Sequence, residues 1–348
     1  MKKIGMRTAL LAWGAAAAYG QTAVTHWDLQ SVNSTGYPQR VETFPFTIQG
    51  VILNDPEEML PLAYQAGASG PSSGGQFQVF IQAVAAGDRG GTALYMSQMS
   101  FIPGNNYDEP TWLSEMQRVR YDGSGRKFRK GDLVEVTARN ALFYNGKRNI
   151  NEGHRNTSSN DFDMALVRPN TVLPPAEALT LADLKHADDS AIFDEFRGTG
   201  GEHWQGMRVR IDAIRLATTN GWGLTNWSDR MCTAADDTGR TLPLRMPLTD
   251  LGPVPETSTW FSAVGILNQE NSATNGYELF VQEIGPVLEI GADSARLSYA
   301  ADYEGFVLEY SDDGLNTWTN LDATPVKVIV VEDATAPTNR TYRLRKVD

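Results

Sequence analysis

Short runs in which hydrophobic and polar residues alternate recur along most of the chain, and this pattern predicts β-strands. In the run 76–84, Phe77, Val79 and Ile81 face one way while three glutamines face the other. The run 208–216 alternates in the same way. The runs are rich in Val, Ile, Thr and aromatic residues and are separated by Gly, Pro, Asn and Asp, which form turns. The pattern therefore predicts an all-β protein.

The expected strands fall into two sets of about five. The first set comprises 46–53, 76–84, 92–99, 132–138 and 141–150, and the second comprises 208–216, 231–235, 241–246, 259–269 and 277–284. The last two strands of the first set are expected to form a hairpin, with Asn145-Gly146 in or beside a turn. A unit of about five strands that recurs after about 150 residues predicts two tandem five-stranded barrels.

The segment between the two sets predicts a linker with short helices. Prolines at positions 169, 174 and 175 interrupt regular structure. Leu179, Leu181 and Leu184 then follow at roughly helical spacing, with Thr180 as a candidate N-cap. At the C-terminus, four more strand-like runs form a unit too small for a large core of its own, so a small β-sandwich-like module is expected. The expected domains are 21–168, 169–200 (the linker), 201–291 and 292–348.

The first twenty residues predict a cleavable signal peptide and hence a secreted or periplasmic protein. Lys2, Lys3 and Arg7 precede an apolar run, and Ala18 and Gly20 are small residues where a signal peptidase reads the chain. A buried N-terminal helix is the alternative. The apolar run is too short to span a bilayer, so the mature chain is expected to carry no transmembrane segment.

Parts of both sets resemble OB-folds. The first set carries the resemblance in 131–137 and in Asn145-Gly146-Lys147-Arg148-Asn149-Ile150, which look like closing OB strands. The segments 179–184 and 202–209 resemble the non-catalytic OB segments of secreted bacterial nucleases. The chain lacks the Gly-Asp-Phe-Asn and Ser-Asp-His motifs of those nucleases, so the resemblance implies OB-like binding modules without the nuclease activity. The run 306–311, Trp318 and Tyr342-Arg343-Leu344 are similar to C-terminal β modules of exported planctomycete- and verrucomicrobia-type proteins.

The composition of the chain disfavours several kinds of binding site but does not identify a ligand. Loss of the signal peptide would change the net charge from −12 to −15, which disfavours non-specific attraction to nucleic acid or anionic lipid. The single cysteine, Cys232, is expected to be buried and inert. Four scattered histidines predict no zinc site, and Asp236-Asp237-Thr238-Gly239 is interpreted as a turn and not as a calcium site, so no cofactor is expected. The sequence contains no motif of a catalytic nucleophile. A pair of carboxylates that acts as a glycosidase site is an alternative that the sequence does not exclude.

A local excess of positive charge is the main candidate for a binding surface. The segment 118–155 carries ten Lys or Arg and only four acidic residues. With neighbouring aromatic residues it predicts a groove for a polyanion, either nucleic acid or an acidic polysaccharide. The expected contacts are Arg118, Arg120, Arg126, Lys127, Arg129, Lys130, Phe143, Tyr144, Lys147 and Arg148. The alternative is a solvated face whose charges pair with acidic neighbours, for instance in the second barrel.

Trp222 and Trp227 lie in a glycine-rich loop of the second set. Exposed indoles there would suit stacking on sugars, and buried indoles would close the end of a barrel; the sequence favours neither.

Three functions remain open. A polymer-binding protein predicts exposed cations beside aromatic residues. An envelope or matrix protein with a protein partner predicts paired cations and an apolar patch elsewhere. A hydrolase predicts a deep pocket with converging carboxylates.

Overall fold

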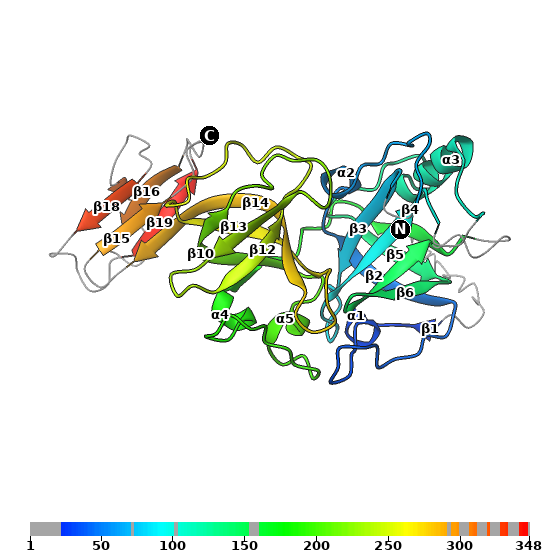
Figure 1. Cartoon of the computed structure of the whole chain (residues 1–348), viewed down its shortest axis with the longest axis horizontal. Helices are drawn as coiled ribbons and strands as arrows, with labels where there is room; N and C mark the ends of the chain where they lie inside the picture. The colour runs from blue at the N-terminus through cyan, green and yellow to red at the C-terminus, as the bar shows by residue number, and fades with distance from the viewer. Residues whose placement is uncertain are drawn as a thin grey trace, which may run out of the picture.

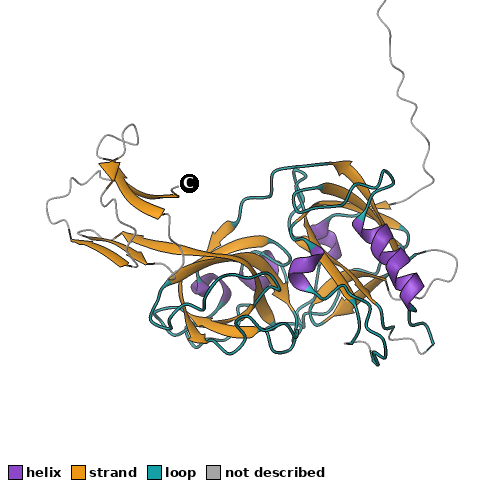
Figure 2. Cartoon of the chain, turned by 90° about the horizontal axis from the view of Figure 1, so that it is seen from above, coloured by secondary structure: helices purple, strands orange, loops and turns teal. Residues whose placement is uncertain are grey.

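The computed structural model describes residues 22–70, 73–100, 104–152, 160–290, 294–298, 306–311, 319–320, 328–332 and 341–346. The expected signal peptide lies outside the described residues. The protein is mostly β, with few and mainly short helices (Figure 2). No helix in the part of the chain that the structure describes is both long and apolar enough to span a bilayer.

The first β unit is one eight-stranded sheet with three helices. Its strands are β1 (Thr22–Ala23), β2 (Phe46–Ile52), β3 (Gln76–Gln82), β4 (Gly91–Ser97), β5 (Leu133–Ala138), β6 (Ala141–Tyr144), β7 (Lys147–Glu152) and β8 (Phe162–Arg168). Their order is β6-β7-β4-β3-β2-β5-β8, with β1 beside β2. The pair β4–β7 is parallel, and β1–β2 is also parallel. The helices are α1 (His26–Leu29), α2 (Pro56–Met59) and α3 (Glu109–Arg120).

The second β unit contains a closed five-stranded barrel. It is built from β10 (Arg208–Thr218), β11 (Met231–Ala235), β12 (Thr241–Arg245), β13 (Phe261–Gln269) and β14 (Tyr277–Ile290). The order β12-β11-β10-β13-β14 closes through a parallel pairing of β12 with β14. The linker supplies β9 (Glu177–Leu179), α4 (Leu181–Leu184) and α5 (Gly200–His203). Leu181 and Leu184 pack into the barrel core. The helix α4 follows the predicted N-cap Thr180, but Leu179 belongs to strand β9, and α5 lies at the end of the predicted linker and beyond it.

The C-terminal strands lie beyond the barrel, at the end of the molecule away from the first unit (Figure 1). The strands β15 (Ser294–Ser298) and β18 (Val328–Glu332) extend the sheet outward from β14. The strands β16 (Phe306–Ser311), β17 (Thr319–Asn320) and β19 (Thr341–Lys346) form a separate three-stranded sheet.

The expected hairpin of 132–138 with 141–150 is wrong. The Asn145-Gly146 turn divides the second segment into β6 and β7, which pair with each other. The strand β5 pairs instead with β2 and β8. Asn145 and Gly146 both have positive φ, the conformation of a two-residue type I′ turn, so the strong hairpin signal applies to β6–β7.

The helix α3 is absent from the sequence-based prediction, although its signals are present. Asp108 caps its N-terminus by accepting a hydrogen bond from the backbone N–H of Thr111 (3.0 Å). Trp112, Met116 and Val119 are buried at the i, i+4, i+7 spacing of one helical face, and all three belong to the core of the first unit. Most of the chain alternates hydrophobic and polar residues, which predicts strands. The helical spacing of these three residues is a separate and shorter signal.

The two units share a hydrophobic cluster. The first unit contributes Leu53, Met59, Leu60, Phe80 and Ala93, and the barrel contributes Ile266 and Phe280. At one crossing the backbones touch: the N–H of Gly91 donates to the carbonyl of Gln205 (3.0 Å). A Cβ on Gly91 would lie 2.0 Å from the carbonyl oxygen of Gly206, so only glycine permits this approach. The junction is therefore packed and hydrogen-bonded.

Candidate ligand site between the two β units

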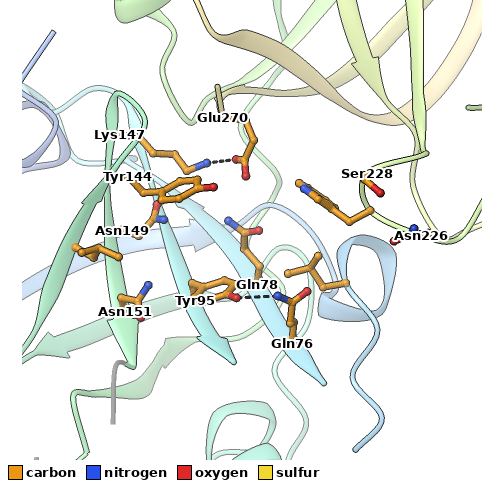
Figure 3. A pocket seen from close by; sticks show the side chains of 13 residues that line it. Gln76, Gln78, Tyr95, Tyr144, Lys147, Asn149, Asn151, Asn226, Ser228 and Glu270 are labelled. Atoms are coloured by element: carbon orange, nitrogen blue, oxygen red, sulfur yellow. Dashed lines mark hydrogen bonds and ion pairs between the residues drawn. The ribbon is translucent and has the colours of Figure 1, made fainter. Parts of the chain in front are cut away.

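A pocket of about 280 Å³ opens at the junction of the two units (Figure 3). This volume is just below the usual range of small-ligand sites, about 300–1,000 Å³. The first unit supplies most of the lining, and the barrel supplies residues from two loops. The lining residues are Leu60, Gln76, Gln78, Tyr95, Leu142, Tyr144, Lys147, Asn149, Asn151, Asn226, Trp227, Ser228 and Glu270.

The wall from the first unit is a polar row across three neighbouring strands. In the register of the sheet, Gln78 of β3 pairs with Tyr95 of β4, and Tyr95 pairs with Asn151 of β7. Side chains at paired positions point to the same face of a sheet. Gln76 and Asn149 each stand two residues away from a member of this row and hence on the same face. The Nε2 group of Gln76 donates to the hydroxyl of Tyr95 (2.9 Å).

Three amide side chains on this wall have hydrogen-bonding capacity to spare. Gln78, Asn149 and Asn151 are buried, with 5–6% of their surface exposed. The Oδ1 atom of Asn149 is enclosed and has no hydrogen-bond partner. The side chains of Gln78 and Asn151 make no hydrogen bond with any residue that the structure describes. Buried polar groups without partners are rare in native proteins. Gln78 and Asn151 line the pocket, and within the described residues their side chains have no partner that a ligand would have to displace.

Lys147 closes the pocket by bridging the two units. Its Nζ atom donates to the Glu270 carboxylate (2.5 Å), to Asn268 Oδ1 (2.8 Å) and to the carbonyl of Gln269 (2.9 Å). All three acceptors belong to the barrel unit, and the Lys147 side chain is only 2% exposed. The charge of Lys147 is thus matched by Glu270, and the pair contributes no net charge to the pocket.

Besides Tyr95, two aromatic side chains reach the pocket from opposite units. Tyr144 at the end of β6 is 41% exposed, and Figure 3 shows its ring beside Lys147 and Asn149. Trp227 lies in the loop between β10 and β11 and lines the other side. The guanidinium of Arg245 lies 4.3 Å from the centroid of the indole, so one face of Trp227 is already covered. Tyr144 is therefore the aromatic side chain with more free surface.

The basic segment of the sequence is largely neutralised by carboxylates of the same chain. Arg118 pairs with Glu115 (2.5 Å), Arg126 with Asp132 (2.7 Å), and Lys130 with Glu58 (3.9 Å). Arg120 and Lys127 share Glu57. Arg148 lies 4.0 Å from Glu42 and donates to the carbonyl of Arg40 (2.9 Å). This pairing is the arrangement that the alternative to a polyanion groove predicted.

The pKa of Asp132 reflects its ion pair with Arg126. Burial pushes the pKa of Asp132 upward. Hydrogen bonds from Arg126 and from the backbone N–H groups of Asn170 and Arg129 outweigh burial and hold the pKa below its ordinary value. Among the predicted contact residues, Arg129 is exposed, and its side chain makes no ion pair within the described residues.

Phe143 and Trp222, which the sequence also predicted as contact residues, do not line the pocket. Phe143 is half-buried, with its ring 6.1 Å from that of Tyr37. Trp222 packs against the barrel core, and its indole N–H donates to the carbonyl of Gly252 (2.9 Å), which fits the barrel-closing interpretation. Of the predicted contact residues, the structure brings only Tyr144, Lys147 and Trp227 together at the pocket. Cys232 is buried, as expected for an inert thiol.

A second group of buried ionisable residues lies elsewhere along the junction. His26 is fully buried, and burial lowers its pKa to about 4. Burial raises the pKa of Glu202 to about 7, although Tyr277 donates its hydroxyl to the carboxylate (2.7 Å). Arg197 is 2% exposed and stacks on Trp27 at 4.0 Å. Each of these groups makes hydrogen bonds, but the Nη2 atom of Arg197 and the Oε2 atom of Glu202 are enclosed without a partner among the described residues.

The pocket has a composition suited to binding. Glu270 is the one carboxylate among the lining residues, and it is bonded to Lys147. Most glycoside hydrolases use two carboxylates that flank the scissile bond. In the described part of the chain, no group of three or more His, Cys, Asp or Glu side chains is placed to hold a metal ion.

Comparison with known proteins adds no relative: no family model matches the chain, and no curated protein matches it.

Proposed function

We propose that this chain is an exported, non-catalytic binding protein made of two OB-like modules, and that its ligand enters the pocket between them. The observation that carries the proposal is a cavity lined by the side-chain amides of Gln78, Asn149 and Asn151 and by the exposed Tyr144. Export rests on the signal-peptide pattern of residues 1–20.

The OB-like interpretation is supported by the order of strand pairing. In the barrel, the first strand β10 pairs with the second and the fourth, and the third strand β12 runs parallel to the fifth. The strands β2, β3, β4, β5 and β7 of the first unit pair in the same sequence, with β4 parallel to β7.

The pocket lies where OB-like modules bind ligands. OB-folds hold oligonucleotides and oligosaccharides on the face of strands 2 and 3 and on the loops that join strands 1–2 and 4–5. Gln76, Gln78 and Tyr95 come from the second and third strands of the first unit. In the barrel, Trp227 lies in the loop between the first two strands, and Glu270 lies in the loop between the last two. The two ligand surfaces thus face each other across one cavity.

The basic segment is the less favoured surface for a ligand. Most cations of this segment form ion pairs with carboxylates of the same chain. A bound polyanion would have to displace those ion pairs. An extended polymer held in the pocket agrees better with the geometry than one held on this segment.

The test compares the two surfaces in one binding panel of neutral oligosaccharides, acidic oligosaccharides and oligonucleotides. A Trp in place of Asn151 fills the pocket, and Arg129→Glu reverses an exposed charge on the basic segment. We expect retention of at least one ligand, abolished by Asn151→Trp and kept in Arg129→Glu. Loss of retention in Arg129→Glu alone would place the ligand on the basic segment. Retention of nothing would favour a structural protein with a protein partner.

A further inference from the structure

We propose that the pocket binds an uncharged saccharide of at least two sugar rings, an inference that rests on the proposed function. The first argument is the type of polar group in the wall. The side-chain amides of Gln78, Asn149 and Asn151 each combine a donor and an acceptor. A sugar hydroxyl also donates and accepts, so one amide can satisfy one or two hydroxyls at once.

The second argument is charge. Lys147 and Glu270 are the charged residues among those that line the pocket, and they are bonded to each other at 2.5 Å. A phosphate or a uronic acid would need a cation, and Lys147 already holds three acceptors of the barrel unit. An uncharged ligand leaves this bridge intact and carries no charge into a half-enclosed site.

The third argument is apolar surface. Leu60, Leu142 and Tyr144 lie beside the amides in the lining. A pyranose ring has C–H groups on its faces and hydroxyls around its rim. An exposed tyrosine ring next to a row of amides matches both parts of that surface.

The length of the row sets the size of the ligand. Gln78, Tyr95 and Asn151 occupy paired positions on three adjacent strands. Adjacent strands lie about 4.8 Å apart, so the row spans roughly 10 Å. A single pyranose ring is shorter than this row, and two linked rings can engage all three strands.

A base of single-stranded nucleic acid is the competing ligand, because amides and aromatic rings also recognise bases. Its phosphates, however, need neighbouring cations for most of their binding energy. The neutralised pocket provides none, so the structure favours the saccharide.

The experiment is isothermal titration of the purified protein with xylohexaose, cellohexaose, maltohexaose, a galacturonate hexamer and a thymidine hexanucleotide. We expect a neutral hexasaccharide to bind, with a Kd that changes less than about twofold between about 50 and about 300 mM NaCl. Tyr144→Ala should weaken this binding at least about tenfold, the loss expected for a stacking contact. Tyr37→Ala, an exposed tyrosine outside the pocket lining, is the matched control and should bind normally.

Asn149→Leu separates loss of the site from loss of the fold. It should also abolish binding, while its melting temperature stays equal to or above that of the wild type, because an unpartnered buried oxygen is removed. If only the charged hexamers bind, and Asn149→Leu abolishes that binding, the saccharide proposal is overturned and the pocket remains a ligand site. If no probe binds, or if binding is unaffected by all pocket variants, both the saccharide proposal and the proposed function are overturned.

Discussion

The two β units pair five strands in the same order, yet only one of them is a closed barrel. In the second unit, β13 and β14 are consecutive strands that pair with each other at nine positions. A parallel pairing of β14 with β12 closes the barrel. In the first unit, the strand β6 is inserted after β5 and pairs with β7, while β8 pairs with β5. The equivalents of β13 and β14 are therefore held apart by partners of their own.

The difference shows how the pocket arises. The inserted strand β6 carries Leu142 and Tyr144 towards the barrel, and the start of β7 carries Lys147. In the closed barrel, the strands are occupied on both edges, and only the connecting loops reach the pocket. One unit thus provides a polar sheet face, and the other provides a rigid rim of loops.

The largest effect is expected from breaking the bridge between the units. Lys147 is buried and Glu270 is partly exposed, so Lys147→Ala leaves a half-buried carboxylate without its cation. Removal of one partner of a buried ion pair costs about 3–5 kcal/mol, and we expect a loss near the lower end of that range. Denaturant unfolding should show this loss in the free energy of unfolding. Arg129→Ala, at an exposed cation without an ion pair in the described residues, should change it by less than about 0.5 kcal/mol. Equal effects of the two variants would mean that Lys147 is not part of a buried bridge.

A second prediction tests whether the two units unfold together. Leu94 in β4 and Leu244 in β12 are fully buried and occupy equivalent third strands. Each change to Ala should cost about 2–5 kcal/mol. Because the units share a hydrophobic cluster, both variants should shift one common calorimetric transition. Two separate transitions, each shifted by only one variant, would show that the junction is weak and the pocket is not preformed.

A smaller effect is expected from the pH dependence of the junction. The pKa of Glu202 is about 7 in the folded protein and near its ordinary value of 4.5 when unfolded. Because the folded pKa is raised, this group's stabilisation is complete below pH 4.5 and is lost as the pH rises towards 7. Between pH 5 and pH 8, the wild type should lose about 2–3 kcal/mol relative to Glu202→Gln.

The comparison with Glu202→Gln isolates one group. The pKa of His26 is lowered to about 4, so His26 destabilises the fold as the pH falls from 6.5 towards 4, which is the opposite direction. The His26 contribution is the same in both proteins and cancels in their difference. Parallel stability curves for the two proteins would contradict a raised pKa for Glu202.

Much of the local structure could be read from the sequence. The strands expected at 231–235 and 241–246 are observed as β11 and β12, within one residue at their ends. The i, i+4, i+7 spacing of Trp112, Met116 and Val119 is a local signal for α3, a helix that the alternating pattern alone does not predict. The strand β5 pairs with β2 and β8, which are both distant in the sheet from β6, its neighbour in sequence. An alternating pattern defines the faces of a strand and carries no information about its neighbour.

The candidate site depended on contacts between distant parts of the chain. The sequence indicated the excess of cations at 118–155, but Lys127 is paired with Glu57 seventy residues earlier, and Lys147 with Glu270 more than a hundred residues later. The pocket likewise combines residues from Leu60 to Glu270. The sequence by itself determined the all-β class, the strand faces and a buried Cys232, because these follow from local periodicity and side-chain polarity. Only the tertiary structure decided which charges are neutralised and which amides stay free, because both depend on which distant strands and loops pack together.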